Sequence, residues 1–276
     1  MATILPFCSD ARTASVADSA PDEMAAPLGV SWYVTIKGTL DFVAALTLFI
    51  FTSPLLLAAM LVVKLTSRGP ALYVQVRTGR NGKPFPIYKI RTMAHQCEKL
   101  TGVQWSSGAG DPRVFRIGRW LRRTHIDELP QLWNVIRGDM SLIGPRPERP
   151  EFVPQLEQAI AHYRQRLLLR PGVTGLAQVQ LPPDSDLDSV RSKLAYDLYY
   201  LRHVNFWLDL RILAATSFKM VGLPFRLIRG CFGFPPKEDV DASYRELNRL
   251  SEVRSERVAM NGHAKGTRAA MGEQGT

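Results

Sequence analysis

The chain has 276 residues, 46% of them hydrophobic, and a formal net charge of +10. This composition excludes a protein that is disordered throughout, and it suits one main domain or at most two. The basic excess is local, because residues 64–149 hold 16 Lys and Arg against 6 Asp and Glu. Such a segment needs an anionic partner, which is nucleic acid, anionic lipid or a phosphorylated substrate.

The cysteines Cys8, Cys97 and Cys231 lie far apart and show no CxxC spacing. This pattern argues against a disulfide framework and a zinc site, and it favours a reducing compartment. Residues 1–30 mix Ala, Ser, Pro and Asp without periodicity, which is typical of a flexible tail. They lack the basic start and the apolar run of a signal peptide.

The next segment is a membrane candidate, because Phe42 to Val63 contains no charged residue and exceeds the required length of about 18 residues. Pro54 in its middle removes a backbone donor, so the helix is expected to kink or break there, with the Ser53 hydroxyl bonding a freed carbonyl. A bent helix would cross the membrane once, whereas a sharp break would return both ends to one face. Lys37, ahead of the segment, slightly favours the re-entrant form.

From residue 70 the sequence predicts a small antiparallel hairpin, with Asn81-Gly82 as its turn. Helical spacing begins at about residue 112, and a second helix is expected at roughly 151–168. The stretch RPGVTGLAQVQL then predicts a turn and a strand. Residues 188–230 are apolar and aromatic but interrupted by charges, so helices in the membrane interface and ordinary core helices both remain open.

Two adjacent acids, Asp127 and Glu128, stand at an expected helix start inside the basic region. Helix capping explains them without any chemistry, because Thr124 to Asp127 fits the S/T-x-x-D/E pattern and Pro130 is tolerated in a first turn. The number of neighbouring cations favours a functional interpretation instead. These cations are Lys89, Arg91, Arg122, Arg123, Arg137, Arg146 and Arg149.

The GPRP sequence fixes Arg146 on a stiff turn between two prolines, and Lys89 and Arg91 end a strand that is expected to aim at the same site. Rigid guanidinium groups suit bidentate binding of phosphate oxygens. One carboxylate can then hold Mg²⁺ together with substrate phosphates, and the other can attack phosphorus. A solvated basic face, or attraction to anionic lipid, explains the number of cations but not the rigid turn.

Four stretches, in this order, resemble the bacterial sugar transferase family over roughly residues 36–222. They are the Ser-Pro pair within one membrane segment, GRNGKPFPIYKIRTM, RRTHIDELPQLWNVIRGDMSLIGPRP and RPGVTGLAQV. Members of this family are monotopic phosphoglycosyl transferases that begin polysaccharide and glycoconjugate assembly on a polyprenyl phosphate. The resemblance therefore implies a transferase that uses a UDP-sugar donor and a polyprenyl phosphate acceptor, undecaprenyl phosphate being the expected one.

Roles in the family carry over to matching positions of this sequence. The resemblance implies that Asp127 is the nucleophile, which releases UMP and forms an aspartyl-phosphosugar intermediate that polyprenyl phosphate then takes up. It implies that Glu128 binds Mg²⁺ and that Arg122 and Arg146 contact phosphates, with Pro147 shaping their pocket. Lys89 and Arg91 are further candidates for substrate binding from their position alone.

We therefore expect an α+β, mainly helical protein with a small β-hairpin, helices on the membrane surface and one re-entrant membrane helix broken at Ser53-Pro54. The expected divisions are a flexible acidic tail at 1–35, the re-entrant helix at 36–64, the transferase domain at 65–230 and a partly helical, then disordered, tail at 231–276. The resemblance implies a catalytic domain on the cytoplasmic face of the bacterial inner membrane. Expected partners are the bilayer, both substrates and later glycosyltransferases of exopolysaccharide, capsule or O-antigen synthesis, and no nucleic acid.

The sequence also departs from the family. It lacks the additional N-terminal membrane helices of the family's long form, and the stretch QLPPDSDLDSVRSK shows no close family pattern, so the sugar is not indicated. Two other functions remain open. One is a membrane-bound Mg²⁺-dependent phosphohydrolase, and the other is a membrane-anchored protein that binds nucleic acid or another anion, for which the sequence offers no base-reading motif.

Overall fold

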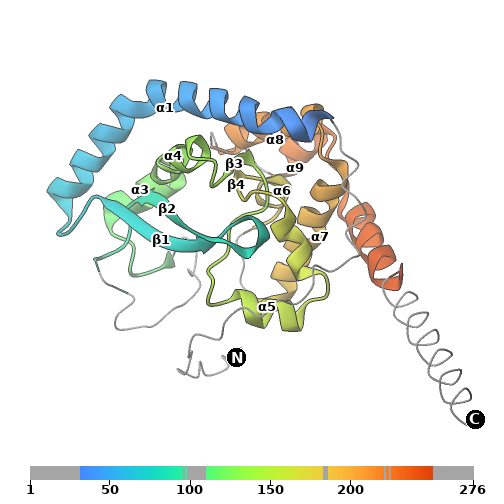
Figure 1. The fold of residues 1–276 in the computed structure, drawn as a ribbon. Helices are drawn as coiled ribbons and strands as arrows, with labels where there is room; N and C mark the ends of the chain where they lie inside the picture. The colour runs from blue at the N-terminus through green and yellow to red at the C-terminus, as the bar shows by residue number, and fades with distance from the viewer. Residues whose placement is uncertain are drawn as a thin grey trace, which may run out of the picture.

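A computed structural model describes residues 32–95, 97, 110–182, 186–220, 222–223 and 225–250 (Figure 1). The helices are α1 (Trp32–Thr66), α3 (Arg116–Arg123), α4 (Gln131–Ile136), α5 (Val153–Ala159), α6 (Leu176–Gln180), α7 (Leu187–His203), α8 (Phe206–Met220) and α9 (Phe225–Phe232). The strands are β1 (Leu72–Thr78), β2 (Pro84–Ile90), β3 (Ser141–Ile143) and β4 (Gly172–Thr174). Short 3-10 turns are η1 (Arg80–Gly82), η3 (Ile126–Glu128) and η4 (Tyr163–Leu168). The mainly helical α+β prediction is confirmed.

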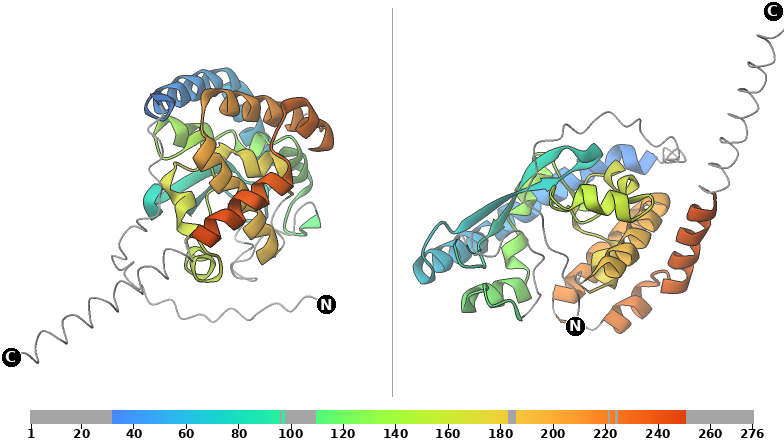
Figure 2. Two further views of the ribbon diagram at one scale, coloured as in Figure 1. Left: turned by 90° about the vertical axis from the view of Figure 1, so that its right-hand side faces the viewer. Right: turned by 90° about the horizontal axis from the view of Figure 1, so that it is seen from below.

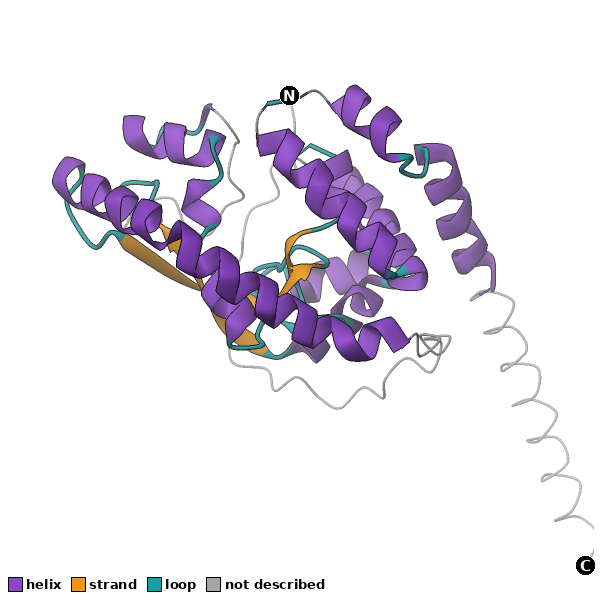
Figure 3. Cartoon of the chain, turned by 90° about the horizontal axis from the view of Figure 1, so that it is seen from above, coloured by secondary structure: helices purple, strands orange, loops and turns teal. Residues whose placement is uncertain are grey.

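The long helix α1 lies across the top of the molecule and turns downward toward its C-terminal end (Figure 1). Seen from above, it is the long helix that crosses in front of the rest of the protein (Figure 3). Within the described residues it is the one helix long and apolar enough to cross a membrane. It runs without interruption through Pro54, so the predicted break is corrected to a bend within one helix. The Ser53 hydroxyl donates to the Ile50 carbonyl at 2.8 Å, and this carbonyl is the one that Pro54 leaves without an amide donor, as predicted.

One side of α1 packs on the rest of the protein, and its other sides expose apolar residues. The buried residues recur mostly every three or four positions, and they are Tyr33, Lys37, Asp41, Ala45, Leu56, Ala59 and Val63. The exposed ones include Leu40, Val43, Ile50, Phe51, Leu57, Leu61 and Leu65. A helix that is apolar all round but covered on one side only needs an apolar environment on its other sides, which favours contact with a membrane.

A buried polar cluster joins the N-terminal end of α1 to α8. Asp209 of α8 accepts hydrogen bonds from Tyr33 at 2.5 Å, from Lys37 at 2.6 Å and from Tyr200 at 2.7 Å. Lys37 also lies 3.4 Å from Asp41, one turn further along α1. Lys37, from which the sequence predicted the membrane topology, is therefore a partner in an internal ion pair.

Two small sheets lie below α1 (Figure 1). Strands β1 and β2 form the predicted antiparallel hairpin, and its turn residues Asn81 and Gly82 have φ values of 55° and 77°, which an Asn-Gly turn favours. Strands β3 and β4 pair in parallel, with Ile143 opposite Thr174. This second pair joins parts of the chain that sequence reasoning did not connect.

Two predicted elements differ from the structure. The expected helix at 151–168 is divided into α5 and η4, because the chain leaves helical geometry at Ile160 and at His162, where φ is 63°. The stretch RPGVTGLAQVQL holds the short strand β4 but continues as α6 rather than as strand. Short apolar runs do not distinguish a buried strand from a buried helix, and tertiary packing decides.

The helices predicted at 188–230 fall into two kinds. Helix α7 is a core helix, with Leu194, Tyr196, Leu198 and Tyr200 among its buried residues, so the interfacial interpretation is wrong for it. Helix α8 keeps an exposed apolar side that includes Trp207, which suits the membrane interface. Residues 1–31 and 251–276 of the expected tails lie outside the described residues, and residues 237–250 form a helix on the flank of the molecule (Figure 2).

Replacing Asp209 with Ala is expected to lower the free energy of unfolding by about 3 kcal/mol, because Lys37 and two tyrosine hydroxyls lose their shared buried acceptor. Unfolding of the detergent-solubilised protein measures this change. The control is Asp188→Ala, which removes an exposed 3.1 Å pair with Arg191 worth less than about 1 kcal/mol. Equal losses in the two variants would contradict a stabilising role for the buried cluster.

Candidate active site

The two acids lie in η3, the turn between α3 and α4. Ile126 begins this turn and packs in a buried apolar cluster with Leu56 and Val63 of α1 and Leu121 of α3. His125, just before it, has a left-handed backbone conformation with φ of 55°, which turns the chain sharply after α3. The turn that carries the acids is therefore packed directly against α1.

The structure does not support the interpretation that these acids belong to a helix cap. The Thr124 hydroxyl donates backward to the carbonyls of Trp120 and Leu121 at 3.0 and 3.1 Å, so it belongs to the end of α3. No side chain caps η3 or α4. Helix capping therefore does not explain why Asp127 and Glu128 occur at this position.

Glu128 is paired with two cations from distant parts of the chain. Its Oε1 lies 2.8 Å from Lys89 Nζ and 3.0 Å from an Arg146 guanidinium nitrogen. Burial alone would raise the pKa of Glu128, but Lys89 and Arg146 lower it well below its usual range. Glu128 is therefore ionised at neutral pH. The structure thus brings three predicted site residues together.

Asp127 has a different environment. It is buried, and its Oδ1 has no hydrogen-bond partner among the described residues. Burial and the neighbouring charge of Glu128 raise the pKa of Asp127, while Lys89, Arg122 and Arg146 act in the opposite direction. A buried oxygen without a partner is costly unless a ligand or an ion supplies the contact, so this atom is a candidate binding position.

Lys89 is held in place through α4. The buried Asn134 donates from its side-chain amide to the Pro86 carbonyl at 2.7 Å and accepts from the Tyr88 amide at 3.2 Å. These bonds fix β2 immediately before Lys89. Burial lowers the pKa of Lys89, and Glu128 offsets this effect.

Arg146 is positioned by the β3–β4 pair. Gly144 approaches the next segment so closely that a Cβ atom there would lie 2.4 Å from the Arg170 carbonyl. The Gly172 amide also donates to the Pro145 carbonyl at 2.9 Å. The GPRP turn is thus held against β4 and the residues just before it. Gly144 is required for this close approach, because a side chain there would clash.

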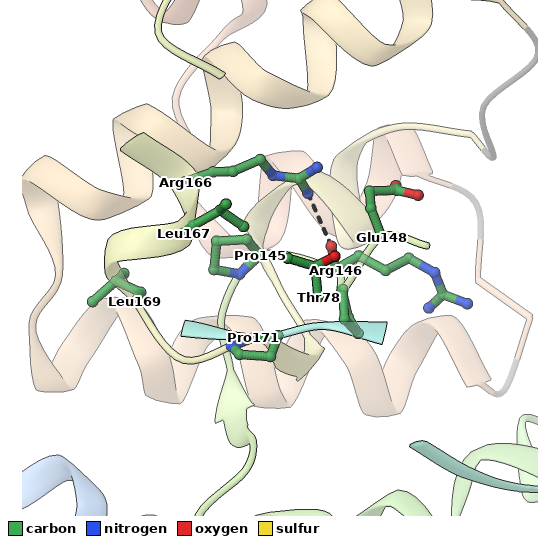
Figure 4. Close-up of a pocket in the computed structure, with 10 residues that line it drawn as sticks. Thr78, Pro145, Arg146, Glu148, Arg166, Leu167, Leu169 and Pro171 are labelled. Carbon is green, nitrogen blue, oxygen red and sulfur yellow. Dashed lines mark hydrogen bonds between the residues drawn. The ribbon is translucent and has the colours of Figure 1, made fainter. Parts of the chain in front are cut away.

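A second arginine supports the same turn from behind. Figure 4 shows Arg166 donating to the backbone carbonyl of Arg146, at 3.0 Å, while the Arg146 guanidinium points away from Leu167 and Leu169. Arg77 donates to the Pro147 carbonyl at 3.2 Å, so Pro147 shapes the turn through its backbone. The cavity between these residues is about 10 Å³, enough for about one water molecule and too small for a nucleotide sugar.

Arg122 lies at the end of α3, and its Nε donates to the Thr92 hydroxyl at 2.9 Å. Helix α3 packs directly on this part of the backbone, because a Cβ atom on Gly118 would lie 2.2 Å from the Thr92 carbonyl. The positive charge of Arg122 acts on Asp127, so the structure places this predicted residue beside the acids.

Arg91 does not join this cluster, contrary to the prediction. Its guanidinium donates to the Pro70 carbonyl at 2.6 Å and to the hydroxyl and carbonyl of Ser67 at 2.7 and 3.0 Å. It is buried and stacks over the Phe115 ring at 5.7 Å. Arg91 therefore holds the turn that follows α1, because β2 ends at Ile90 and the strand alternation no longer applies to it.

Sequence reasoning missed two residues near the acids. His125 adjoins them in the chain, and burial lowers its pKa, with further effects from Glu128, Lys219, Arg146 and Lys89. Lys219 comes from α8, far away in the sequence. His125 was visible as a neighbour of Asp127, whereas nothing in the sequence connects Lys219 to this site.

The residues fit a hard divalent cation that keeps open coordination positions. No group of three or more His, Cys, Asp or Glu side chains gathers in the described part of the chain. Mg²⁺, however, is commonly bound by one or two carboxylates together with substrate phosphates. The unpartnered Asp127 Oδ1 and the ionised Glu128 beside it supply such a donor set.

Comparison with known proteins places this chain among sugar transferases. The family model for bacterial sugar transferases matches residues 32–222. The UDP-N-acetylgalactosamine-undecaprenyl-phosphate N-acetylgalactosaminephosphotransferase of Aeromonas hydrophila is 43% identical over 184 residues, which are 67% of this chain and 43% of that protein. The UDP-glucose:undecaprenyl-phosphate glucose-1-phosphate transferase of Caulobacter vibrioides is 44% identical over 182 residues, 65% of this chain and 67% of that protein.

The exopolysaccharide production protein PSS of Rhizobium leguminosarum is 38% identical over 188 residues, which are 66% of this chain and 94% of that protein. The chain spans less than half the length of the Aeromonas relative but can be aligned with nearly all of the Rhizobium one. The match to the family model covers most of the chain, including α1, the acids and the GPRP turn. The protein therefore belongs to the bacterial sugar transferase family.

Proposed function

We propose that this protein transfers a sugar 1-phosphate from a UDP-sugar to a polyprenyl phosphate in the membrane and releases UMP. The observation that carries this proposal is the buried Asp127, whose Oδ1 has no hydrogen-bond partner among the described residues, beside an ionised Glu128 that is paired with Lys89 and Arg146. The names of the relatives support undecaprenyl phosphate as acceptor and a UDP-hexose or UDP-N-acetylhexosamine as donor.

The reaction has two steps. A carboxylate oxygen of Asp127 forms a bond to the sugar-bearing phosphorus, and the bond from this phosphorus to the bridging oxygen breaks, so that UMP leaves with the electron pair. An oxygen of polyprenyl phosphate then attacks the same phosphorus, the bond to Asp127 breaks, and the carboxylate is restored. The product is a polyprenyl diphosphate sugar, which a later glycosyltransferase would extend.

The protein's own charges support each step. Burial and Glu128 raise the pKa of Asp127, while Lys89, Arg122 and Arg146 act in the opposite direction and favour the ionised carboxylate, which is the form that attacks phosphorus. The Arg146 side chain is 39% exposed while it holds Glu128, so it can also contact substrate phosphate. Arg122, at the end of α3, adds a further positive charge near Asp127. Pro147 and Arg77 keep the Arg146 turn rigid.

Mg²⁺ would be held by Glu128, with Asp127 nearby, and would neutralise charge on the substrate diphosphate. This proposal follows from the donor set described above. Lys89 and Arg146 hold Glu128 in one orientation through Oε1, so the position of the carboxylate does not depend on the ion.

We also propose that α1 enters the membrane without crossing it, with the catalytic residues on the cytoplasmic face. Its N-terminal end is tied to α8 through the Lys37–Asp209 pair at 2.6 Å. Its C-terminal half packs through Leu56 and Val63 on Leu121 and Ile126 near the acids. Both ends thus contact the same globular part of the protein, which supports a re-entrant arrangement over a simple crossing.

The proposal is tested by incubating the purified protein with Mg²⁺, undecaprenyl phosphate and a panel of UDP-sugars while UMP is measured. We expect one donor to give UMP continuously with the lipid, and at most one UMP per protein without it. Continuous release of free sugar phosphate without the lipid would instead identify a phosphohydrolase. No release of UMP or sugar phosphate from any nucleotide sugar would contradict an enzymatic role.

Replacing Asp127 with Asn should remove both the covalent intermediate and UMP formation, a loss of at least about 10³-fold, because the amide is not a nucleophile. Incubation with donor labelled in the sugar, followed by mass spectrometry of the protein, detects the intermediate. Asp188→Asn, an exposed carboxylate on α7, is the matched control. A folded Asp127→Asn protein with normal turnover would exclude Asp127 as the nucleophile.

Removing divalent cations with EDTA should stop UMP formation, and added Mg²⁺ should restore it. In Glu128→Gln we expect the Mg²⁺ concentration for half-maximal activity to rise by about tenfold or more, since a neutral amide binds the ion weakly. Asp139→Asn, which changes an acid outside the cluster, serves as control. Unchanged Mg²⁺ dependence in Glu128→Gln would assign the ion to other residues.

Membrane topology can be read from Cys8 in the N-terminal segment after Cys97 and Cys231 are replaced with Ser. In intact cells, a membrane-impermeant thiol reagent should leave Cys8 unmodified, and it should modify Cys8 after the cells are opened. Modification in intact cells would mean that α1 crosses the membrane.

A further inference from the structure

Lys219 lies in the last turn of α8, and its ammonium group donates to the Gln178 carbonyl of α6 at 2.5 Å. One turn earlier in α8, the Thr216 hydroxyl lies 2.7 Å from the Thr174 hydroxyl at the end of β4. These two contacts hold the C-terminal end of α8 against the junction between β4 and α6. The position of Lys219 is therefore fixed by two neighbouring segments.

This junction adjoins the active-site turn. Strands β3 and β4 are parallel, so their carboxyl ends meet at one edge of the sheet. Arg146 follows β3 at this edge, and α6 follows β4 there. The Gly144 amide donates to the Thr174 carbonyl at 2.9 Å, which ties the two segments together. Lys219 and Arg146 thus reach the same edge from different elements.

Electrostatic effects agree with this placement. Burial lowers the pKa of Lys219, Arg146 lowers it further, and Glu128 acts in the opposite direction. Both the active-site arginine and the active-site glutamate are therefore close enough to influence the Lys219 ammonium group. The side chain of Gln178, whose backbone binds Lys219, also has a buried Oε1 without a hydrogen-bond partner among the described residues.

The surroundings of Lys219 distinguish it from the other cations of the site. Its neighbours in α8, Phe218 and Met220, are 47% and 40% exposed. Lys219 therefore lies beside exposed apolar side chains at the C-terminal end of α8, and it is also influenced by the charge of Glu128. Lys89, by contrast, comes from the hairpin, and Arg146 comes from the GPRP turn. An amphipathic substrate with a lipid chain and a phosphate fits the α8 surroundings better than a water-soluble nucleotide does.

We propose that Lys219 binds the phosphate of the lipid acceptor and positions it for attack, while Lys89 and Arg146 serve the donor. This inference rests on the proposed function. The chemistry recognised is a phosphate oxyanion, which both the polyprenyl phosphate and the donor diphosphate carry, so the test must separate the two substrates.

A covalent intermediate allows this separation, because in a two-step reaction the kcat/KM of each substrate reports on its own half-reaction. The experiment compares Lys219→Met and Lys219→Arg with the unchanged full chain in detergent, with undecaprenyl phosphate and the UDP-sugar that supports UMP release. In Lys219→Met we expect kcat/KM for the lipid to fall by about tenfold or more, since a charge-assisted contact to phosphate is lost. The value for the UDP-sugar should stay within about twofold, and Lys219→Arg should recover part of the lost activity toward the lipid.

Arg211→Met is the matched control, because Arg211 is a cation on the same helix that contacts the carbonyls of Phe232 and Gly233 instead. Equal falls in both kcat/KM values in Lys219→Met would indicate a merely structural role for the contact with Gln178 and would overturn the proposal. A fall for the UDP-sugar alone would assign Lys219 to the donor, and no change in either value would remove it from the site. Turnover by the unchanged protein tests the proposed function itself, so the two failures are distinguishable.

Discussion

The arrangement of the site depends on one partly buried carboxylate, Glu128, and its ion pairs with Lys89 and Arg146. The three residues come from the η3 turn, the hairpin and the GPRP turn, which are far apart in the sequence. A buried ion pair is stable only when every charge keeps its partners, so loss of either cation would leave a strongly desolvated acid. The pairing therefore fixes how these segments meet, and within the described part of the chain it leaves Oδ1 of the adjacent Asp127 without a hydrogen-bond partner.

Helix α1 has two roles, one through its exposed sides and one through its buried side, and its apolar sequence does not distinguish them. Its exposed apolar sides suit a membrane, while its buried side forms part of the protein core through Leu56 and Val63. Because Ile126 packs in the same cluster, the acids are held at a fixed position relative to the membrane-facing helix. Under the proposed function, this fixed position would let a soluble donor and a lipid acceptor reach the same carboxylate.

The basic residues that give the chain its positive charge have different roles in the structure. Arg91 holds the turn after α1, whereas Arg77 and Arg166 support the backbone of the GPRP turn. Lys89 and Arg146 face the acids directly. A guanidinium group that is already bound to several carbonyls is not available for substrate, so the number of cations in a sequence overstates the number in a site.

Local rules were enough to predict several elements from the sequence. The Asn-Gly hairpin turn, the long apolar segment and the adjacent acids Asp127 and Glu128 follow from residue type and short-range order. Local rules did not show that Pro54 bends α1 without breaking it, that Arg91 turns away from the site, that α6 is a helix or that α7 is part of the core. These outcomes depend on packing between distant segments, which a periodic pattern does not contain. The same holds for Lys219, because the parallel pairing of β3 with β4 brings the end of α8 to the edge from which Arg146 follows β3.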